Sequence, residues 1–385
     1  MKKLECHLSF DNTCCWMWTL SSIFVGFKIL EEKGLLKVKS VSMDRNFRAD
    51  GRYPDRMIVE LKADGKTIAY DMSDGYQSIN IPELFDSQLD RIDYYFKSSY
   101  DPNFAEKLRN HDKFLPLGIA YECSCDGNYF EKANINDALK NHRYKEFAFQ
   151  ILTKAKRQRL LNYKNFEGNE HFDNYKILFW SRLWNVHTTP EEILKVYSEL
   201  DYDRAKEKAE TQNRMFEDVN RQRIQCVQVL KKEFGSRFVG GLSDSEESRS
   251  LAPELITHDP AIETREEYLA SLKKNYINVL SKGLHGCIGA RYGETFAAGR
   301  AFMTDPLVYA PAGNPQKDIN YLEYTDAYSL AENMNRLITD VDRIHEIENA
   351  NNEYYNNYVR PDSRILNTLK IAFPEYFKKN RTADF

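Results

Sequence analysis

Residues 276–302 read YINVLSKGLHGCIGARYGETFAAGRAF, and this stretch carries the signals of a strand, a glycine-rich loop and a helix in that order. The apolar run at 276–283 predicts a strand, and residues 294–302 predict a short helix whose small side chains allow close packing on a sheet. A strand that passes through a loop into a helix is the repeating unit of a parallel α/β sheet. The stretch therefore predicts an α/β fold.

The same succession recurs through the second half of the chain. KILFWSRLW at 176–184 predicts a buried strand, and a charged helical region follows over 189–234. RFVGGLS at 237–243 predicts the next strand, and TREEYLASLKK at 264–274 predicts a helix that Thr264 caps. Strands and helices that alternate at this spacing indicate parallel βαβ units in a doubly wound sheet.

The first half also mixes strand and helix signals. Asp64 and Gly65 separate two runs of strand-forming residues, which predicts a tight hairpin turn. Residues 133–162 carry one long helical pattern, and the polar run at 162–176 predicts a linker. Further strands are expected at 3–10, 36–43, 92–96 and around 115–120, and a further helix at 17–33.

These patterns predict two Rossmann-like domains that face each other across a cleft. We expect an N-terminal domain over residues 1–165 and a C-terminal domain over 166–360. A C-terminal helix or tail at 361–385 is expected to pack back on the N-terminal domain. Ligands of open α/β sheets bind beyond the carboxyl ends of the strands, so functional residues are expected in the loops there.

The composition is that of a globular protein whose task is not to hold a nucleic acid. Of 385 residues, 42% are hydrophobic and 29% charged, which is enough apolar surface to bury a core. The formal net charge of −4 argues against a protein that grips a nucleic-acid backbone. Neither a long apolar run nor a signal-peptide pattern is present. We therefore expect a cytoplasmic enzyme, with contact at the inner face of the membrane left open.

The seven cysteines show no metal-ligand spacing. Neither the Cys14–Cys15 pair nor the Cys123–Cys125 pair has a second Cys or His pair at the distance that a zinc site needs. Reduced thiols in a cytosolic protein are the simpler interpretation. We expect no metal and no cofactor.

The glycine-rich loop within 276–302 is the strongest candidate for a ligand site. Its glycines let the backbone approach a ligand, and free N–H groups at a helix start favour an anion such as a diphosphate. Glu294 is expected in the first helical turn, where its carboxylate accepts hydrogen bonds from vicinal sugar hydroxyls. His285 lies in the loop, and Arg182 ends the 176–184 strand, where it suits phosphate recognition. A glutamate that satisfies the helix dipole and a surface salt bridge of Arg182 are the structural alternatives.

Carboxylates also follow expected strands of the first half. Asp11 comes after the first strand, where it would act as general base toward an acceptor hydroxyl or cap the next helix. Asp71 and Asp74 end another strand and would hold an acceptor sugar or shape a turn before Gly75.

Five segments of the second half extend this interpretation. ILFWSRLW, LKKEFGSRFVGGL, CIGARYGETFAAGRAFMTDPL, NYLEYTD and NNEYYNNYVRP occur in this order within 176–361. Together they resemble the C-terminal half of GT-B glycosyltransferases of the exostosin-like and related bacterial polysaccharide type. The resemblance implies that Glu294 binds hydroxyls of a nucleotide-sugar donor, that Arg182 faces its diphosphate, and that no metal is needed. Ala301 stands where many retaining members carry a second glutamate, so inversion and retention both stay open.

The residues and the resemblance together predict a glycosyltransferase. It would move a sugar from a nucleotide-activated donor to a hydroxyl of a saccharide or lipid-linked glycan, in surface-polysaccharide or glycan synthesis. A non-catalytic nucleotide- or saccharide-binding protein and a nucleotide-sugar epimerase on the same scaffold are the alternatives. No nucleic-acid partner is expected, and peripheral membrane contact through the basic run at 154–164 is left open.

The expected site residues fall into three groups. The expected base is Asp11, and the expected acceptor-binding residues are Asp71 and Asp74. The expected donor-binding residues are Arg182, Arg221, His285, Gly286, Arg291, Gly293, Glu294 and Thr295.

Overall fold

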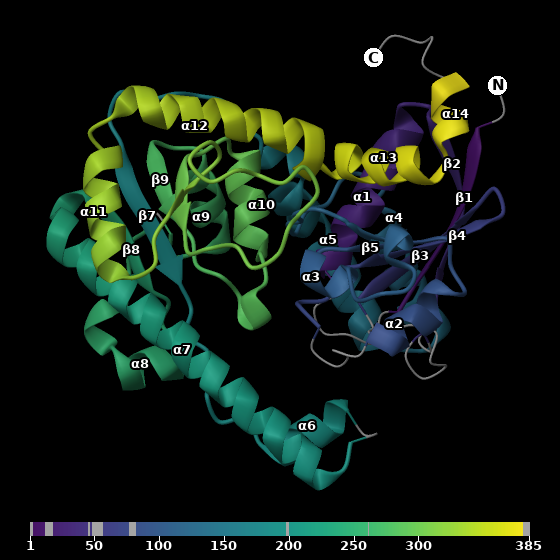
Figure 1. Cartoon of the computed structure of the whole chain (residues 1–385), viewed down its shortest axis with the longest axis horizontal. Helices are drawn as coiled ribbons and strands as arrows, with labels where there is room; N and C mark the ends of the chain where they lie inside the picture. The colour runs from purple at the N-terminus through teal and green to yellow at the C-terminus, as the bar shows by residue number, and fades with distance from the viewer. Residues whose placement is uncertain are drawn as a thin grey trace.

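Two α/β units, each with one central sheet, make up the chain (Figure 1). The first half of the sequence forms one sheet and the second half forms the other, so the predicted fold class is confirmed. The computed structural model describes residues 3–11, 18–44, 47, 57–76, 82–197, 200–260 and 262–379.

The first sheet has six strands in the order β2-β1-β3-β4-β5-β6. All neighbours are parallel except for β3, which runs antiparallel to both β1 and β4. The turn from β3 to β4 places Asp64 and Gly65 at φ values of 44° and 76°, which confirms the predicted hairpin. The strands are β1 (Leu4–Phe10), β2 (Leu36–Met43), β3 (Ile58–Ala63), β4 (Lys66–Asp71), β5 (Tyr94–Lys97) and β6 (Phe114–Pro116).

The single helix predicted over 133–162 is wrong, because the chain forms two helices there. Helix α4 (Tyr129–Lys140) ends where the Asn141 side chain bonds back to the last helical turn and His142 adopts a φ of 57°. Helix α5 (Tyr144–Leu161) starts directly after this turn. A left-handed residue breaks a helix, and Asn and His enter that region more readily than most residues. The other helices of this half are α1 (Trp18–Glu32), α2 (Pro82–Leu89) and α3 (Pro102–Ala105).

The second sheet is parallel throughout, with five strands in the order β11-β10-β9-β7-β8. The prediction of parallel βαβ units is therefore confirmed, and Thr264 forms the capping box expected at the start of α9. The strands are β7 (Lys176–Ser181), β8 (Phe238–Leu242), β9 (Tyr276–Val279), β10 (Phe302–Thr304) and β11 (Leu322–Glu323). The helices are α6 (Pro190–Val196), α7 (Tyr202–Phe234), α8 (Glu246–Leu251), α9 (Arg265–Leu272), α10 (Ala290–Ala297) and α11 (Ala327–Leu337).

The C-terminal helices run from the second unit to the first. Figure 1 shows α12 (Val341–Tyr354) beside the second sheet, and a π-helical turn (Tyr355–Val359) leads from it into α13 (Pro361–Ala372). Helices α13 and α14 (Pro374–Lys379) then lie beside the first sheet.

Helix α13 packs closely on α1. Ile365 and Leu369 belong to the same hydrophobic core as the buried face of α1, and Lys33 forms an ion pair with Asp362 at 2.7 Å. Gly26 allows the close approach, since a Cβ there would lie 2.4 Å from the Pro361 carbonyl oxygen. The domain boundaries at residues 165 and 360 stay predictions.

The carboxyl edges of the two sheets face each other. The loops that follow β4, β5 and β6 of the first sheet all reach the second unit, which brings the strand ends of both sheets to one junction. The contacts are Gly75 with His285, the Tyr100 carbonyl oxygen with the Ala310 amide at 2.9 Å, and Ala120 with Gly293. This junction is where ligands of open α/β sheets bind.

Candidate functional site at the facing sheet edges

Three arginines converge at the carboxyl edge of the second sheet. Arg182 follows β7, Arg223 lies on α7, and Arg291 is the second residue of α10. Arg223 donates from Nη1 to the Arg182 carbonyl oxygen at 2.5 Å and from Nε to Ser281 Oγ at 3.3 Å. Burial lowers the pKa of Arg223 to about 10, and the positive charges of Arg291 and Arg182 contribute to that shift. Arg223 therefore lies close enough to both other guanidinium groups to be repelled by them.

Aromatic rings, not carboxylates, hold two of these guanidinium groups. Arg182 lies 4.5 Å from the ring centroid of Trp184, and Arg291 lies 5.3 Å and 5.1 Å from those of Trp180 and Tyr268. Among the described residues, no carboxylate forms an ion pair with any arginine of this cluster. Ring contacts position a cation without neutralising it. Within the part of the chain that the structure describes, the cluster thus presents positive charge without an ion-paired carboxylate.

The start of α10 adds to the same charge. Its N-cap, Gly289, offers no side-chain hydrogen bond to the first backbone N–H groups. Arg291 lies in that first turn, where the helix dipole disfavours a cation unless an anion is bound. Free N–H groups and guanidinium groups together suit a phosphate or diphosphate. We call Arg182, Arg223, Arg291 and the start of α10 the arginine cluster.

The first-turn position predicted for Glu294 is wrong. Helix α10 starts at Ala290, so Glu294 is its fifth residue and is only 1% exposed. Arg265 binds both of its carboxylate oxygens, with Nη1 3.1 Å from Oε2 and Nη2 on Oε1. The carboxylate is thus engaged inside the protein, and its predicted contact with donor hydroxyls stays a prediction.

A second carboxyl group near this ion pair was not found from the sequence. Glu122 lies just beyond Ala120, in the segment of the first unit that contacts α10. Burial raises the pKa of Glu122, while Arg265 acts against that shift and Glu294 adds to it. A carboxyl group with a raised pKa between two facing sheet edges is a candidate for proton transfer. No local motif marks Glu122, because its neighbours are brought in by the fold.

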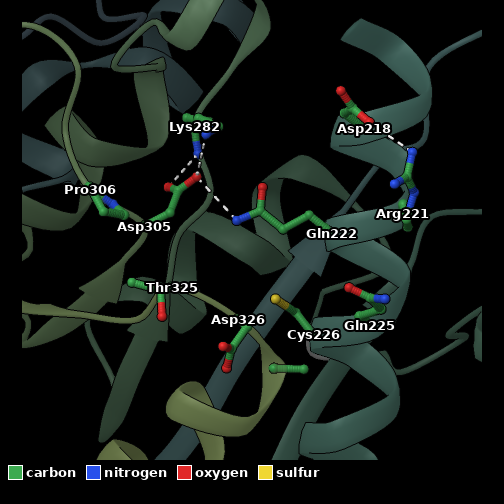
Figure 2. A pocket seen from close by; sticks show the side chains of 11 residues that line it. Asp218, Arg221, Gln222, Gln225, Cys226, Lys282, Asp305, Pro306, Thr325 and Asp326 are labelled. Carbon is green, nitrogen blue, oxygen red and sulfur yellow. Dashed lines mark hydrogen bonds and ion pairs between the residues drawn. The ribbon is translucent and has the colours of Figure 1, made fainter. Parts of the chain in front are cut away.

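Arg221 does not belong to the arginine cluster. Its side chain is exposed and forms an ion pair with Asp218 at 2.7 Å. It lines a pocket of about 350 Å³ between α7 and the loops after β9, β10 and β11 (Figure 2). In that pocket Asp305 accepts hydrogen bonds from the Lys282 amide at 2.9 Å and from Gln222 Nε2 at 3.1 Å. Residues two apart on a helix lie on different faces, and Arg223 is the one that faces the sheet edge.

Three of the predicted donor-binding positions serve packing in this structure. Thr295 is fully buried, and Gly293 lets α10 approach the first unit, since a Cβ there would lie 2.8 Å from the Ala120 carbonyl oxygen. Gly286 adopts a φ of 73° and lies against Val308. Their predicted donor-binding roles find no support in this placement.

Asp71 is occupied by contacts within its own sheet. Its side chain accepts hydrogen bonds from the Tyr95 hydroxyl at 2.6 Å, from Lys97 Nζ at 3.0 Å and from the Ser73 amide at 2.8 Å. Asp71 and Lys97 are both buried. A carboxylate with these partners shapes the end of β4, so the structural alternative for Asp71 is the one that its geometry favours.

Asp74 and Asp11 lie at the same edge. Asp74 faces the second unit, where burial and, after it, the charge of Asp74 raise the pKa of the Cys287 thiol. Asp11 is buried directly after β1, two strand spacings from Asp71, or about 10 Å. The acceptor role of Asp74 and the base role of Asp11 stay predictions.

His285 is held at the centre of the junction. Its φ is 56°, its amide contacts Met215 Sδ at 3.0 Å, and its carbonyl oxygen accepts a hydrogen bond from the Tyr309 hydroxyl at 2.8 Å. Burial lowers the pKa of His285 to about 4, and the charge of Lys208 contributes. The imidazole is therefore neutral at pH 7 and adds no further charge to the cluster.

This shift predicts a specific pH dependence of stability. The unfolded His285 binds a proton below about pH 6.5, but the folded one does so only near pH 4. The neutral form thus contributes stability above pH 6.5 that is lost as the pH falls toward 4. We expect His285→Asn to lose less stability than the wild type between pH 7 and pH 4, as measured by urea unfolding. The free energy of unfolding of His111→Asn, at an exposed histidine, should depend on pH as that of the wild type does. If both variants lose the same free energy of unfolding between pH 7 and pH 4, the prediction is contradicted.

Comparison with known proteins gives low similarities. No protein-family model and no curated protein matches the sequence. Among solved structures, a glycosyltransferase from Rickettsia africae is 12% identical with a TM-score of 0.37, and covers 97% of this chain and 84% of its own. Anabaena HepE in complex with UDP and glucose is 10% identical with a TM-score of 0.37, and the match covers 94% of this chain and 98% of the HepE chain. The UDP-GlcNAc 2-epimerase from Neisseria meningitidis is 12% identical with a TM-score of 0.38, and the match covers 98% of this chain and 100% of the epimerase chain. At these values the similarities do not carry a function, which has to come from the residues of this chain.

Proposed function

We propose that this chain is a glycosyltransferase that moves a sugar from a nucleotide-activated donor to a hydroxyl of a saccharide or lipid-linked acceptor. The observation that carries the proposal is the arginine cluster: three guanidinium groups with no carboxylate partner among the described residues, beside an uncapped helix start. Such a site costs stability unless an anion occupies it, and a diphosphate fits its charge. The cluster lies where two α/β sheets face each other, so a second substrate can be held opposite.

The chemistry that this arrangement supports is departure of a diphosphate. As the bond from sugar to phosphate breaks, negative charge grows on the leaving phosphate, and donors already in place stabilise it. Arg182, Arg223 and Arg291 supply that charge without a metal ion. Asp11 and Glu122 are the candidates for the base that takes the acceptor proton.

A binding and turnover experiment tests this function. We expect at least one of UDP, GDP and CDP to bind in isothermal titration, and to bind more tightly than the monophosphate CMP because its second phosphate adds charged contacts. The corresponding nucleotide-sugar should be consumed with transfer to an acceptor, and EDTA should not abolish the reaction. Binding without turnover on any acceptor would indicate a binding protein. Conversion of the sugar without an acceptor would indicate an epimerase, and either outcome would overturn the proposal.

Contact with a membrane surface is part of the proposal, because a lipid-linked acceptor lies there. Helix α5 carries exposed apolar side chains, of which Leu152 is 81% exposed and Phe149 63%. Lys154, Lys156 and Arg159 follow on the same helix. Among the described residues, no helix has the length and apolarity to cross a bilayer. Apolar residues beside basic ones are typical of a helix that lies in an anionic membrane surface.

This surface yields a measurable prediction. We expect the protein to sediment with vesicles that contain anionic lipid and to bind them at least ten times more weakly after Phe149→Ser and Leu152→Ser together. Each residue would lose burial of a large apolar side chain, worth about 1.5–3 kcal/mol when complete. Tyr202→Ser, at an exposed aromatic residue of the second unit, is the matched control. Equal binding of all three proteins would exclude α5 as the contact.

A further inference from the structure

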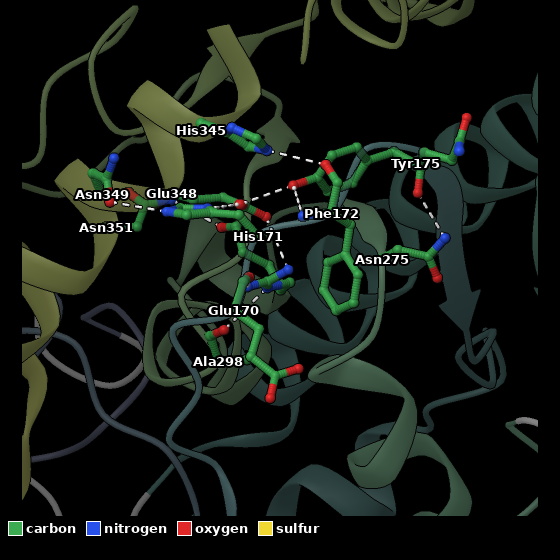
Figure 3. Close-up of polar contacts among 12 residues, drawn as sticks. Glu170, His171, Phe172, Tyr175, Asn275, Ala298, His345, Glu348, Asn349 and Asn351 are labelled. Atoms are coloured by element: carbon green, nitrogen blue, oxygen red, sulfur yellow. Dashed lines mark hydrogen bonds and ion pairs between the residues drawn. The ribbon is translucent and has the colours of Figure 1, made fainter. Parts of the chain in front are cut away.

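A second polar cluster lies at the opposite end of the second sheet. His345 and Glu348 are one turn apart on α12, and His171 comes from the segment that leads into β7 (Figure 3). One ligand atom from each of the three residues lies within 4.8 Å of the others. We propose that His171, His345 and Glu348 bind a divalent transition-metal cation, with Zn²⁺ as the best fit. This inference is independent of the proposed transferase function.

The orientation of His345 suits a metal ligand. Its Nε2 lies 3.0 Å from the Phe172 carbonyl oxygen, which only accepts hydrogen bonds. Nε2 therefore carries the proton in the neutral ring, and Nδ1 keeps its lone pair. Among the described residues, Nδ1 makes no hydrogen bond. A histidine that binds a metal commonly donates its other ring N–H to a backbone carbonyl in this way, which fixes the tautomer.

The surroundings of His171 call for a cation. Its Nδ1 lies 2.7 Å from Glu348 Oε2, and its Nε2 lies 3.1 Å from Asn349 Oδ1. If Nε2 donates to Asn349, the lone pair of Nδ1 points at a carboxylate oxygen, which is repulsive. A hydrogen on Nδ1 removes that repulsion, and so does a metal ion bound to both groups, for which the two atoms move apart from 2.7 Å to roughly 3.3 Å. The ring centroids of His171 and His345 lie 4.5 Å apart, so both imidazoles line the same site.

Glu348 is prepared to act as the carboxylate ligand. It is fully buried, its Oε1 forms an ion pair with Arg300 at 3.0 Å, and the Tyr175 hydroxyl donates to its Oε2 at 2.9 Å. These contacts fix the direction of the carboxylate, as outer partners of metal ligands do. His171 is exposed, so an ion can reach the site and keep a water as fourth ligand.

The ligand set and position indicate which ion is bound and why. Two imidazole nitrogens and one carboxylate oxygen suit Zn²⁺ and its neighbours, whereas Mg²⁺ and Ca²⁺ prefer oxygen ligands alone. The site lies before Lys176, where β7 begins, and Arg182 follows the end of that strand. The two sites are thus separated by the length of β7, about 20 Å at 3.3 Å per residue. The metal would join the segment before β7 to α12 and take no part in sugar transfer.

Metal binding to the full-length chain tests the proposal. After removal of metals with EDTA, we expect one Zn²⁺ to bind per chain in equilibrium dialysis and to raise the melting temperature by several degrees, with no rise for Mg²⁺. His171→Asn and His345→Asn should each weaken Zn²⁺ binding at least tenfold. His111→Asn, at an exposed histidine of the first unit, should bind as the wild type does.

Each possible result decides the question. His171→Asn also removes the 2.7 Å contact with Glu348, so the metal-free melting temperature of this variant serves as its own reference for the rise with Zn²⁺. Co²⁺ should give the visible absorption of a four- or five-coordinate site in the wild type and not in this variant. If Zn²⁺ binds both proteins equally, the metal is held elsewhere and the proposal is overturned. Absence of Zn²⁺ binding at 100 times the protein concentration would also overturn it, and nucleotide binding would be unaffected in every case.

Discussion

Replacing Arg300 with methionine should lower the free energy of unfolding by about 3–5 kcal/mol, the cost of removing one partner of a buried ion pair. Arg300 and Glu348 are both fully buried, and Nη1 lies 3.0 Å from Oε1. Methionine fills most of the same volume, so the loss would come from the carboxylate left behind in a medium of low polarity and from the Ala298 and Glu170 carbonyl oxygens that lose their donor. Urea unfolding of the metal-free protein measures it.

Arg364 offers a matched control within the same chain. It is as deeply buried as Arg300, but it donates to Ser22 Oγ at 2.8 Å and to the Ile119 carbonyl oxygen at 3.3 Å, and no carboxylate among the described residues pairs with it. Burial lowers its pKa to about 10. Arg364→Met removes a charge that is costly to bury and leaves none behind, so its loss should be smaller by at least about 2 kcal/mol. Equal losses of unfolding free energy would show that breaking the ion pair between Arg300 and Glu348 costs no more than removing the contacts of Arg364.

The parts of the fold that follow local rules could be predicted from the sequence. Alternation of apolar strands with helices gave the parallel second sheet, and Asp64-Gly65 between strand-forming runs gave the hairpin. Arg182 is predicted at a strand end because the apolar run before it identifies the strand. Each of these inferences uses residues that are neighbours in the sequence, and local physical chemistry decides their conformation.

The sequence-based predictions fail where a displacement of a few residues along a helix changes the direction in which a side chain points. The start of α10 was expected at Glu294, but Gly289 ends the loop without a side-chain cap, and the helix begins at Ala290. Arg221 is a predicted donor-binding residue and stays one, but Arg223 is the arginine of α7 that faces the sheet edge, because charges distributed around α7 do not reveal which face is buried. Helical phase depends on tertiary packing, and composition alone does not supply it.

The remaining features depend on residues far apart in the chain. His171 and Glu348 are separated by 177 positions, and their contact exists only because α12 crosses the start of β7. Glu122 acquires its raised pKa from burial against the second unit. No spacing rule within a single segment predicts such groups, because only the fold brings their members together.

Replacing Arg291 with alanine should weaken binding of the nucleotide diphosphate about 10- to 100-fold, because a hydrogen bond to a charged group contributes about 1.5–3 kcal/mol. Among the described residues, the contacts found for the Arg291 guanidinium are with the rings of Trp180 and Tyr268. Its removal therefore leaves no buried partner unsatisfied, and the melting temperature should change little. Isothermal titration with the diphosphate that the wild type binds measures the effect.

The choice of variants separates an anion site from general attraction by positive charge. Arg291→Lys keeps the charge but loses the planar pair of donors, so it should recover only part of the affinity. Arg221→Ala removes an exposed arginine that is paired with Asp218 and should leave the affinity unchanged. If Arg221→Ala weakens binding as much as Arg291→Ala does, long-range charge is the cause. If Arg291→Ala binds as the wild type does, the diphosphate is bound elsewhere, and the arginine cluster loses the role on which the proposed transfer depends.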